Sequence, residues 1–275
     1  MTTATTQAPS ERTKLPILRW QLRSGLWGLI GWCVGLALTL LLYLSVYPSI
    51  QSPQLKDMIN SLPKQISGTL GLDRIATGAG YTQATYFGLI GFLLAAIACI
   101  IWGSQSVAGE ESSGRLELTL SHAISRGQYA LESFIALIVR ILALSAMTII
   151  VLLLLNGPFK LSLAAGNIVI TTAAWGGLVL VAGSTALAVG SMSGRPSWSI
   201  GAGAAVTVTS YAFDAVSKSS SSLQWLSNIS PYSWAFGDDP LSTGRGWGGI
   251  ALLGGLSILL FGLGYWVFSR RDLHG

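Results

Sequence analysis

The amino-acid sequence predicts an all-α integral membrane protein with six transmembrane helices. The 275 residues are 51% apolar and only 10% charged, and the mean hydropathy is +0.59. A soluble domain of this length needs more charge to cover its surface. The apolar residues also gather into blocks of about 20 residues, which is the length of a helix that crosses a bilayer. Short polar and basic segments separate these blocks.

Six apolar blocks meet this length, and we interpret the chain as one transmembrane domain, 1–275. A cytoplasmic N-terminal segment, 1–25, precedes the bundle of 26–268, and a cytoplasmic tail, 269–275, follows it. The predicted helices cover residues 26–47, 86–108, 131–155, 168–192, 198–216 and 247–268.

The distribution of Lys and Arg predicts the orientation of the helices. With the N-terminus inside, nine basic residues lie in cytoplasmic segments and six in outer segments. Because positively charged loops tend to stay in the cytoplasm, we expect both termini there. The net charge of +5 does not indicate nucleic-acid binding, since the basic residues lie in these short loops. Gly194 and Pro196 predict a tight hairpin between the fourth and fifth helices.

Residues 14–25 predict a short helix that lies along the inner membrane surface. Pro16 suits the first turn of a helix, and Trp20 suits the level of the lipid headgroups. The residues that form its apolar face and the basic positions beside it are Leu18, Arg19, Trp20, Leu22 and Arg23. The alternative is an ordinary basic flank of the first transmembrane helix.

The two longer outer loops each contain an apolar pattern. In the first, the spacing of Leu55, Ile59 and Leu62 predicts a short helix that ends at Pro63. In the last, about residues 217–246, three aromatic residues are typical of interface anchors. They are Trp225, Tyr232 and Trp234.

The inner loop between the second and third helices is the most informative connector. It carries the acidic pair Glu110 and Glu111, then Gly114, and then leucines at 116, 118 and 120. A solvated connector does not need this series of leucines, whereas a segment that docks into a groove of a partner does. A helix that lies flat on the membrane explains the leucines equally well.

Several enzymatic and cofactor-dependent functions are excluded. No G-x-x-x-x-G-K-[ST] motif is present to hold ATP phosphates, and no H-E-x-x-H zinc motif is present. His122 and His274 lie outside the predicted helices, so no Ser–His dyad forms within the membrane. Cys33 and Cys99 both fall in apolar blocks, which disfavours a disulfide or a zinc site. We therefore expect a chain that is not an enzyme and binds no cofactor itself.

Two charged residues lie within the predicted helices and are candidates for a translocation path. Arg140 is placed near the middle of the third helix, and Asp214 near the outer end of the fifth. An intramembrane charge costs roughly 2.5–3.5 kcal/mol on insertion scales, so both side chains should face protein or water. Glu132 lies eight residues before Arg140, too far for a direct pair on one helix. Arg140 either lines a substrate cavity or holds the bundle together.

The inner loop resembles that of the membrane permeases of type-2 ATP-binding-cassette (ABC) transporters. In that family an acidic pair is followed by Gly, a Leu-rich stretch and a small residue before Arg, here Ser125 and Arg126. The C-terminal segment 268–273, the N-terminal helix, the six helices and residues 228–234 also fit. The family often has Pro before the last step, where this chain has residues 122–124, His-Ala-Ile.

The resemblance implies a transport subunit that is driven by a separate ATPase. Residues 110–121 would be the coupling helix, seated on a cytoplasmic ATPase subunit, and residues 15–25 the connecting helix. Two ATPase subunits would bind ATP and Mg²⁺, and a second permease subunit, identical or related, would complete a dimer in the cell membrane of a prokaryote. The residues implied in coupling are Glu110, Glu111, Gly114, Arg115, Leu116, Glu117, Leu118, Ser121 and Arg126.

The resemblance also implies export, with an amphipathic drug-like or antibiotic molecule, or a lipid, as the substrate. The residues supply a physical reason for the contact, because the glutamates can pair with basic groups while the leucines fill a groove. An ATP-independent carrier or channel is the alternative, and it predicts paired charges or broken helices at mid-depth. A membrane scaffold or immunity subunit without a transported substrate is the third possibility.

Overall fold

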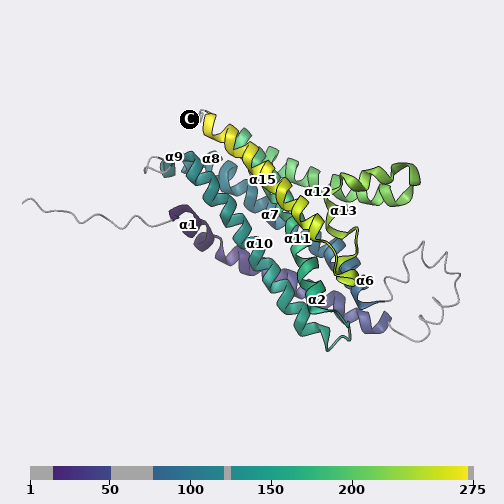
Figure 1. Cartoon of the computed structure of the whole chain (residues 1–275). Coiled ribbons are helices and arrows are strands. Elements are labelled where there is room, and N and C mark those ends of the chain that lie inside the picture. The colour runs from purple at the N-terminus through teal and green to yellow at the C-terminus, as the bar shows by residue number, and fades with distance from the viewer. Residues whose placement is uncertain (1–14, 51–76, 121–124, 272–275) are drawn as a thin grey trace, which may run out of the picture.

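The computed structural model describes residues 15–50, 77–120 and 125–271 and contains only helices and short connections in these ranges (Figure 1). The long elements are α2 (Leu26–Ile50), a continuous run of α6 (Gly78–Thr82), η1 (Gln83–Ile90), α7 (Gly91–Ser104) and η2 (Gln105–Gly109), then α10 (Arg126–Asn156), α11 (Ala165–Ser193), α12 (Pro196–Ser219) and α15 (Trp247–Arg270). The short ones are α1 (Pro16–Ser24), α8 (Glu110–Ser112), α9 (Arg115–Leu120), η3 (Ser221–Asn228), α13 (Pro231–Phe236) and α14 (Pro240–Thr243).

Five helices in the described ranges are long and apolar enough to cross a membrane. They begin at the first residues of α2, α6, α10, α11 and α15. The helix predicted over 198–216 forms as α12 and has 24 residues. It is not among the five, because Ser, Thr and Gly residues and Asp214 dilute its apolar residues.

The second transmembrane helix is longer than the predicted 86–108 and runs from Gly78 to Ser112. Two parts of it, η1 and η2, have π-helical hydrogen bonding, which is rare and often marks functional positions. The apolar pattern that the prediction used is interrupted by Gln83 before residue 86 and by Glu110 and Glu111 after residue 108. The helix therefore reaches almost to α9.

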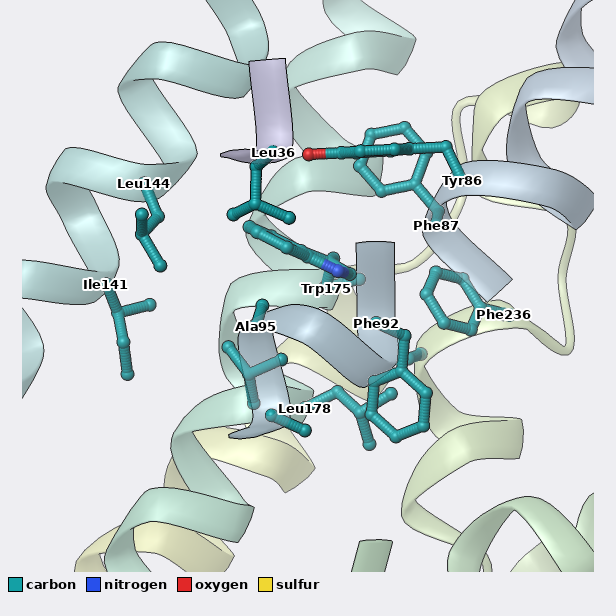
Figure 2. Packing of buried hydrophobic residues seen from close by; sticks show 14 of the residues in the cluster. Leu36, Tyr86, Phe87, Phe92, Ala95, Ile141, Leu144, Trp175, Leu178 and Phe236 are labelled. Atoms are coloured by element: carbon teal, nitrogen blue, oxygen red, sulfur yellow. The ribbon is translucent and has the colours of Figure 1, made fainter. Parts of the chain in front are cut away.

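The bundle is centred on α11, the most buried of the five apolar helices. Trp175 of α11 lies at the middle of the core, among Leu36, Ala95 and the rings of Tyr86 and Phe87 (Figure 2). Its ring is 6.3 Å from that of Tyr86 and 6.2 Å from that of Phe87. These contacts join α2, η1, α7 and α11 into one apolar core.

The bundle has two ends with different short helices. At one end lie α1, α8, α9 and the last turn of α15, and at the other lie α6, α13 and α14 (Figure 1). We call these the α1 end and the α13 end. The α11–α12 hairpin belongs to the α1 end, because Gly194 approaches Glu111 of α8. Gly194 adopts a φ of 66° and Pro196 begins α12, which confirms the predicted hairpin.

The short helix predicted after residue 14 forms as α1, with Pro16 as its first residue. Its most buried residues are Ile17 and Gln21, whereas the predicted apolar positions Leu18 and Leu22 are half-buried. The three remaining predicted positions of this helix are exposed, and they are Arg19, Trp20 and Arg23. The helix is thus amphipathic, and its orientation along the membrane surface stays a prediction.

Two expectations about the outer loops have different outcomes. The predicted helix over Leu55–Leu62 lies outside the described residues. Tyr232, predicted as an interface anchor, is instead buried beside Phe92, Tyr211 and Phe236. Its hydroxyl donates a 2.8 Å hydrogen bond to the carbonyl oxygen of Gly88 in η1, which satisfies the polar atom and makes burial favourable.

Candidate coupling surface and the buried arginine

The inner loop forms a small knob at the α1 end, made of α8 and α9 (Figure 1). Gly114 lies between the two helices with a φ of 69°, a left-handed conformation that Gly adopts at low cost. The expected single coupling helix over 110–121 is therefore two short helices with a sharp turn between them. Ser121 lies outside the described residues.

The knob has a buried side and an exposed side. Leu116 is fully buried in a small apolar cluster that also contains Ile17 of α1 and Phe268 of α15. Glu117 is exposed, and the side chain of Leu118 is 67% exposed. One short helix therefore anchors the knob and presents an acidic and an apolar group outward.

Glu110 is paired within the knob. Its two carboxylate oxygens accept hydrogen bonds from Arg115 Nε and Nη2, at 3.1 and 3.0 Å. This two-pronged geometry closes the turn at Gly114, although Arg115 remains 61% exposed, so the pair contributes little stability.

Glu111 is tied to the C-terminal end of α15 through Arg271. Arg271 Nη2 donates to Glu111 Oε1, and Arg271 Nη1 donates to the carbonyl oxygen of Met192 in α11 at 3.0 Å. The carbonyl oxygen of Arg271 accepts from Arg126 Nη1 at the start of α10. Arg271 thus joins the knob to three long helices. Of the three glutamates expected to meet a partner's basic groups, only Glu117 has no such in-chain contact among the described residues.

Two charged residues of α10 hold the two ends of α1. Glu132 Oε2 accepts from the backbone N–H of Leu18 in the first turn of α1, at 2.9 Å. Arg140 Nη2 donates to the carbonyl oxygen of Gln21 near the last turn, at 2.6 Å. An acid at the N-terminus and a base at the C-terminus both complement the helix dipole. Glu132 and Arg140, although too far apart to pair, therefore act together on α1.

Arg140 also borders a cavity of about 300 Å³ between α1, α2, η2, α8 and α10. Its side chain is only 7% exposed and lies 5.4 Å from the ring centre of Trp102. Arg140 stands midway along α10, and its guanidinium reaches Gln21 and Gly25, just before α2 begins, so the charged group points toward the α1 end. Arg140 is therefore both a tie between helices and part of a cavity wall, and its role in a translocation path stays a prediction.

Asp214 lies at the opposite end of the bundle, so the two predicted path residues are not brought together. Its carboxylate accepts from Lys218 Nζ at 2.7 Å and from Ser233 Oγ at 2.8 Å. Asp214 and Lys218 line two open hollows of about 410 and 670 Å³. The contact with Ser233 connects α12 to α13, which is a structural role.

Sequence reasoning missed three residues that organise the α1 end. In the sequence, Gln21 is one position of a predicted helix, Arg271 belongs to the C-terminal segment that resembles the family, and Glu132 is too far from Arg140 for a direct pair. The eight-residue spacing of Glu132 and Arg140, about 12 Å along a helix, is a usable signal because it matches the length of a short helix such as α1.

These features define a multi-pass helical membrane protein: apolar helices long enough to cross a bilayer surround a common core, and a polar knob protrudes at one end. A family model described as ABC-2 family transporter protein matches residues 16–273. The chain therefore belongs to the ABC-2 transporter family, which confirms the resemblance of the inner loop. Permeases of this family are membrane transport subunits that typically work with ABC ATPase subunits. A comparison with curated proteins finds none that matches.

Proposed function

We propose that this chain is the membrane-spanning subunit of an ATP-driven exporter. Two ATPase subunits bind ATP and Mg²⁺ and seat against the knob, and a second permease, identical or related, completes the translocation path. The substrate is an amphipathic small molecule of drug or antibiotic type, or a lipid. In this proposal the α1 end faces the cytoplasm of a prokaryotic cell.

The proposal includes six membrane crossings, which are the five apolar helices and, in addition, α12. Ile17 of α1 and Phe268 of α15 belong to the same apolar cluster, so the described chain begins and ends at one end of the bundle. A chain that begins and ends on one side needs an even number of crossings. The five apolar helices and α12 supply that number. The helix α12 begins at the hairpin of Gly194 and reaches the α13 end, where Asp214 contacts Ser233.

The observation that carries the proposal is the two-sided construction of the knob. Outward, it offers Glu117 and Leu118 to a partner. Inward, it is connected to α1 and α15 through Leu116 and to α11 and α15 through Glu111 and Arg271. A displacement of the outer face is thereby passed to the ends of the long helices, because packed contacts shift between discrete arrangements instead of deforming gradually.

The test is to change the outer face of the knob and to measure capture of the ATPase. Leu118→Ala together with Glu117→Lys should lower co-purification with a co-expressed partner ATPase subunit by at least about tenfold, a typical effect of losing interface anchors. ATP-stimulated transport in vesicles should fall with it. The matched control is Leu154→Ala, since Leu154 is as exposed as Leu118 but lies at the far end of α10.

Two results would contradict the proposal. One is full ATPase capture and transport by the double variant. The other is transport by the chain in vesicles that contain no ATPase, which would favour an ATP-independent carrier.

A further inference from the structure

The guanidinium of Arg140 is a buried cation with no anionic partner in the described part of the chain. No carboxylate lies within 4 Å of it there. Among the described residues its hydrogen bond is to the neutral carbonyl oxygen of Gln21, and the ring of Trp102 lies beside it. Because a buried charge is costly unless an opposite charge compensates it, this site favours the entry of an anion.

The cavity beside Arg140 has room for such an anion. It measures about 300 Å³, and its lining is rich in polar side chains. The carboxylate among them, Glu110, already accepts two hydrogen bonds from Arg115, one on each oxygen. The positive charge of Arg140 therefore remains available to a guest. The polar lining residues other than Arg140 are Gln21, Ser24, Gln105, Ser106 and Glu110.

The surroundings of the cavity resemble the membrane–water interface. Trp20 lines it and is half-exposed, and Arg19 and Arg23 are exposed on the same helix. Basic and aromatic side chains on an amphipathic helix are typical of the headgroup level of anionic membranes.

On its other side the cavity is bordered by α2. Gly28 lines it, and a Cβ added there meets no atom within 4 Å, so the wall is open at this point. Gly31, Gly35 and Leu42 follow Gly28 on the same face of α2, and all three are exposed. A guest with a phosphate at Arg140 could thus extend hydrocarbon chains along α2.

We propose that this cavity binds the headgroup phosphate of an anionic phospholipid from the leaflet that contains α1. Arg140 donates to the phosphate oxygens through the N–H groups that Gln21 leaves free, a geometry for which guanidinium groups are well suited. The exposed amide of Gln105 supplies a further donor. Since α1 ends at the same place, a bound lipid would fix the junction of α1 and α2. The inference is independent of the proposed transport function and needs no ATPase.

The experiment measures lipid retained by the full chain after extraction from nanodiscs, by native mass spectrometry. Nanodiscs of phosphatidylglycerol and phosphatidylcholine in equal parts serve as the source. We expect phosphatidylglycerol to be retained in preference, and Arg140→Gln to lower its retention by at least about tenfold, as for the loss of a charge-assisted contact. The matched control is Arg270→Gln. Arg270 also stacks on a tryptophan, Trp266 at 4.5 Å, but it is exposed and borders no part of this cavity.

A second variant keeps the test decisive if Arg140→Gln loosens α1. Gly28→Phe retains the cation and fills the open wall, so it should lower retention as well. Equal retention by wild type, Arg140→Gln and Gly28→Phe would overturn the proposal. Glycerol 3-phosphate tests the source of the phosphate: if it binds the lipid-free chain in an Arg140-dependent way and phosphatidylglycerol is not retained, the lipid assignment is wrong and the ligand is a water-soluble phosphate.

Discussion

The two ends of the bundle are held together by different physical means. At the α1 end, a cluster of only eight buried apolar residues is supplemented by charged contacts of Glu111, Glu132, Arg140 and Arg271. At the α13 end, aromatic rings pack edge to face around Tyr232, and most of the hydrogen bonds there involve neutral groups. The α13 end is also continuous with the main core, to which Tyr232 and Phe236 belong.

This difference separates a fixed end from an adjustable one. Apolar close packing must be disrupted as a unit, because each buried side chain fills the space between its neighbours. Ion pairs and backbone contacts of arginine side chains can be exchanged for water or for a partner's groups one at a time. The end that meets the proposed ATPase is thus the end that is built from exchangeable contacts.

The largest effect is expected from crowding the α13 end. A Cβ on Gly249 of α15 would lie 1.8 Å from the carbonyl oxygen of Trp234, which is backbone and cannot move aside alone. Gly249→Ala should therefore destabilise the fold by about 3 kcal/mol or more, seen as a large fall in the midpoint of thermal unfolding in detergent. The neighbouring Gly248→Ala, which meets nothing within 4 Å, should unfold like wild type. Similar midpoints for both variants would show that the α13 end is not tightly packed.

A smaller effect is expected from breaking the tie between the knob and α15. Glu111→Gln leaves the guanidinium of Arg271, only 18% exposed, without its carboxylate. Stability should fall by about 1–2 kcal/mol, since the pair is mostly buried but borders water. If the tie transmits motion, the variant should still capture the ATPase and hydrolyse ATP, while transport per ATP decreases. Unchanged transport per ATP would show that Glu111 does not take part in coupling ATP hydrolysis to transport.

Removing the hydroxyl of Tyr232 should destabilise the α13 end by less than the Glu111→Gln substitution destabilises the α1 end. Tyr232→Phe keeps the aromatic packing and loses the hydrogen bond to the Gly88 carbonyl oxygen, a change of about 1 kcal/mol. Burial raises the pKa of Tyr232, and the nearby Asp214 carboxylate raises it further. A phenol whose pKa is higher in the folded than in the unfolded protein contributes to the free energy of unfolding. This contribution is fully present below the pKa of the unfolded state, about 10, and decreases as the pH rises above it. The advantage of wild type over Tyr232→Phe should therefore shrink in unfolding midpoints measured above about pH 10, and a constant advantage would contradict this origin.

The smallest effect is expected from the exposed pair of the knob. Arg115→Ala removes both contacts with Glu110, but a pair this exposed contributes at most about 0.5 kcal/mol. The unfolding midpoint should hardly change in low salt and not at all in high salt, where exposed charges are screened. A fall as large as that of Glu111→Gln would mean that the turn at Gly114 depends on this pair.

The sequence was sufficient to predict the parts of the structure that local chemistry determines. Pro16 began α1, Gly194 and Pro196 formed the hairpin, and the apolar blocks became helices, because each signal acts within a few residues. The extent of the second helix was missed because its two ends are polar, with Gln83 near the start and Glu110 and Glu111 near the end.

The contacts that define the candidate site could not be predicted in the same way. Glu111 and Arg271 are 160 positions apart, and Gln21 and Arg140 are 119 apart. Only the packing of the whole bundle brings such groups together, and periodicity within one helix carries no information about it. The same holds for Tyr232, whose burial depends on a carbonyl oxygen in another helix.

The junction of α1 and α2 has a consequence for how related chains can vary. Gly25 is the single residue between these helices, and a Cβ there would lie 2.6 Å from Arg140 Nη2. A side chain at this position would displace the guanidinium from the Gln21 carbonyl oxygen. We therefore expect the two positions to change as a pair in evolution: relatives with a larger residue at the junction should lack the arginine, and relatives that keep the arginine should keep glycine. An alignment of the family in which the two positions vary independently would refute this linkage.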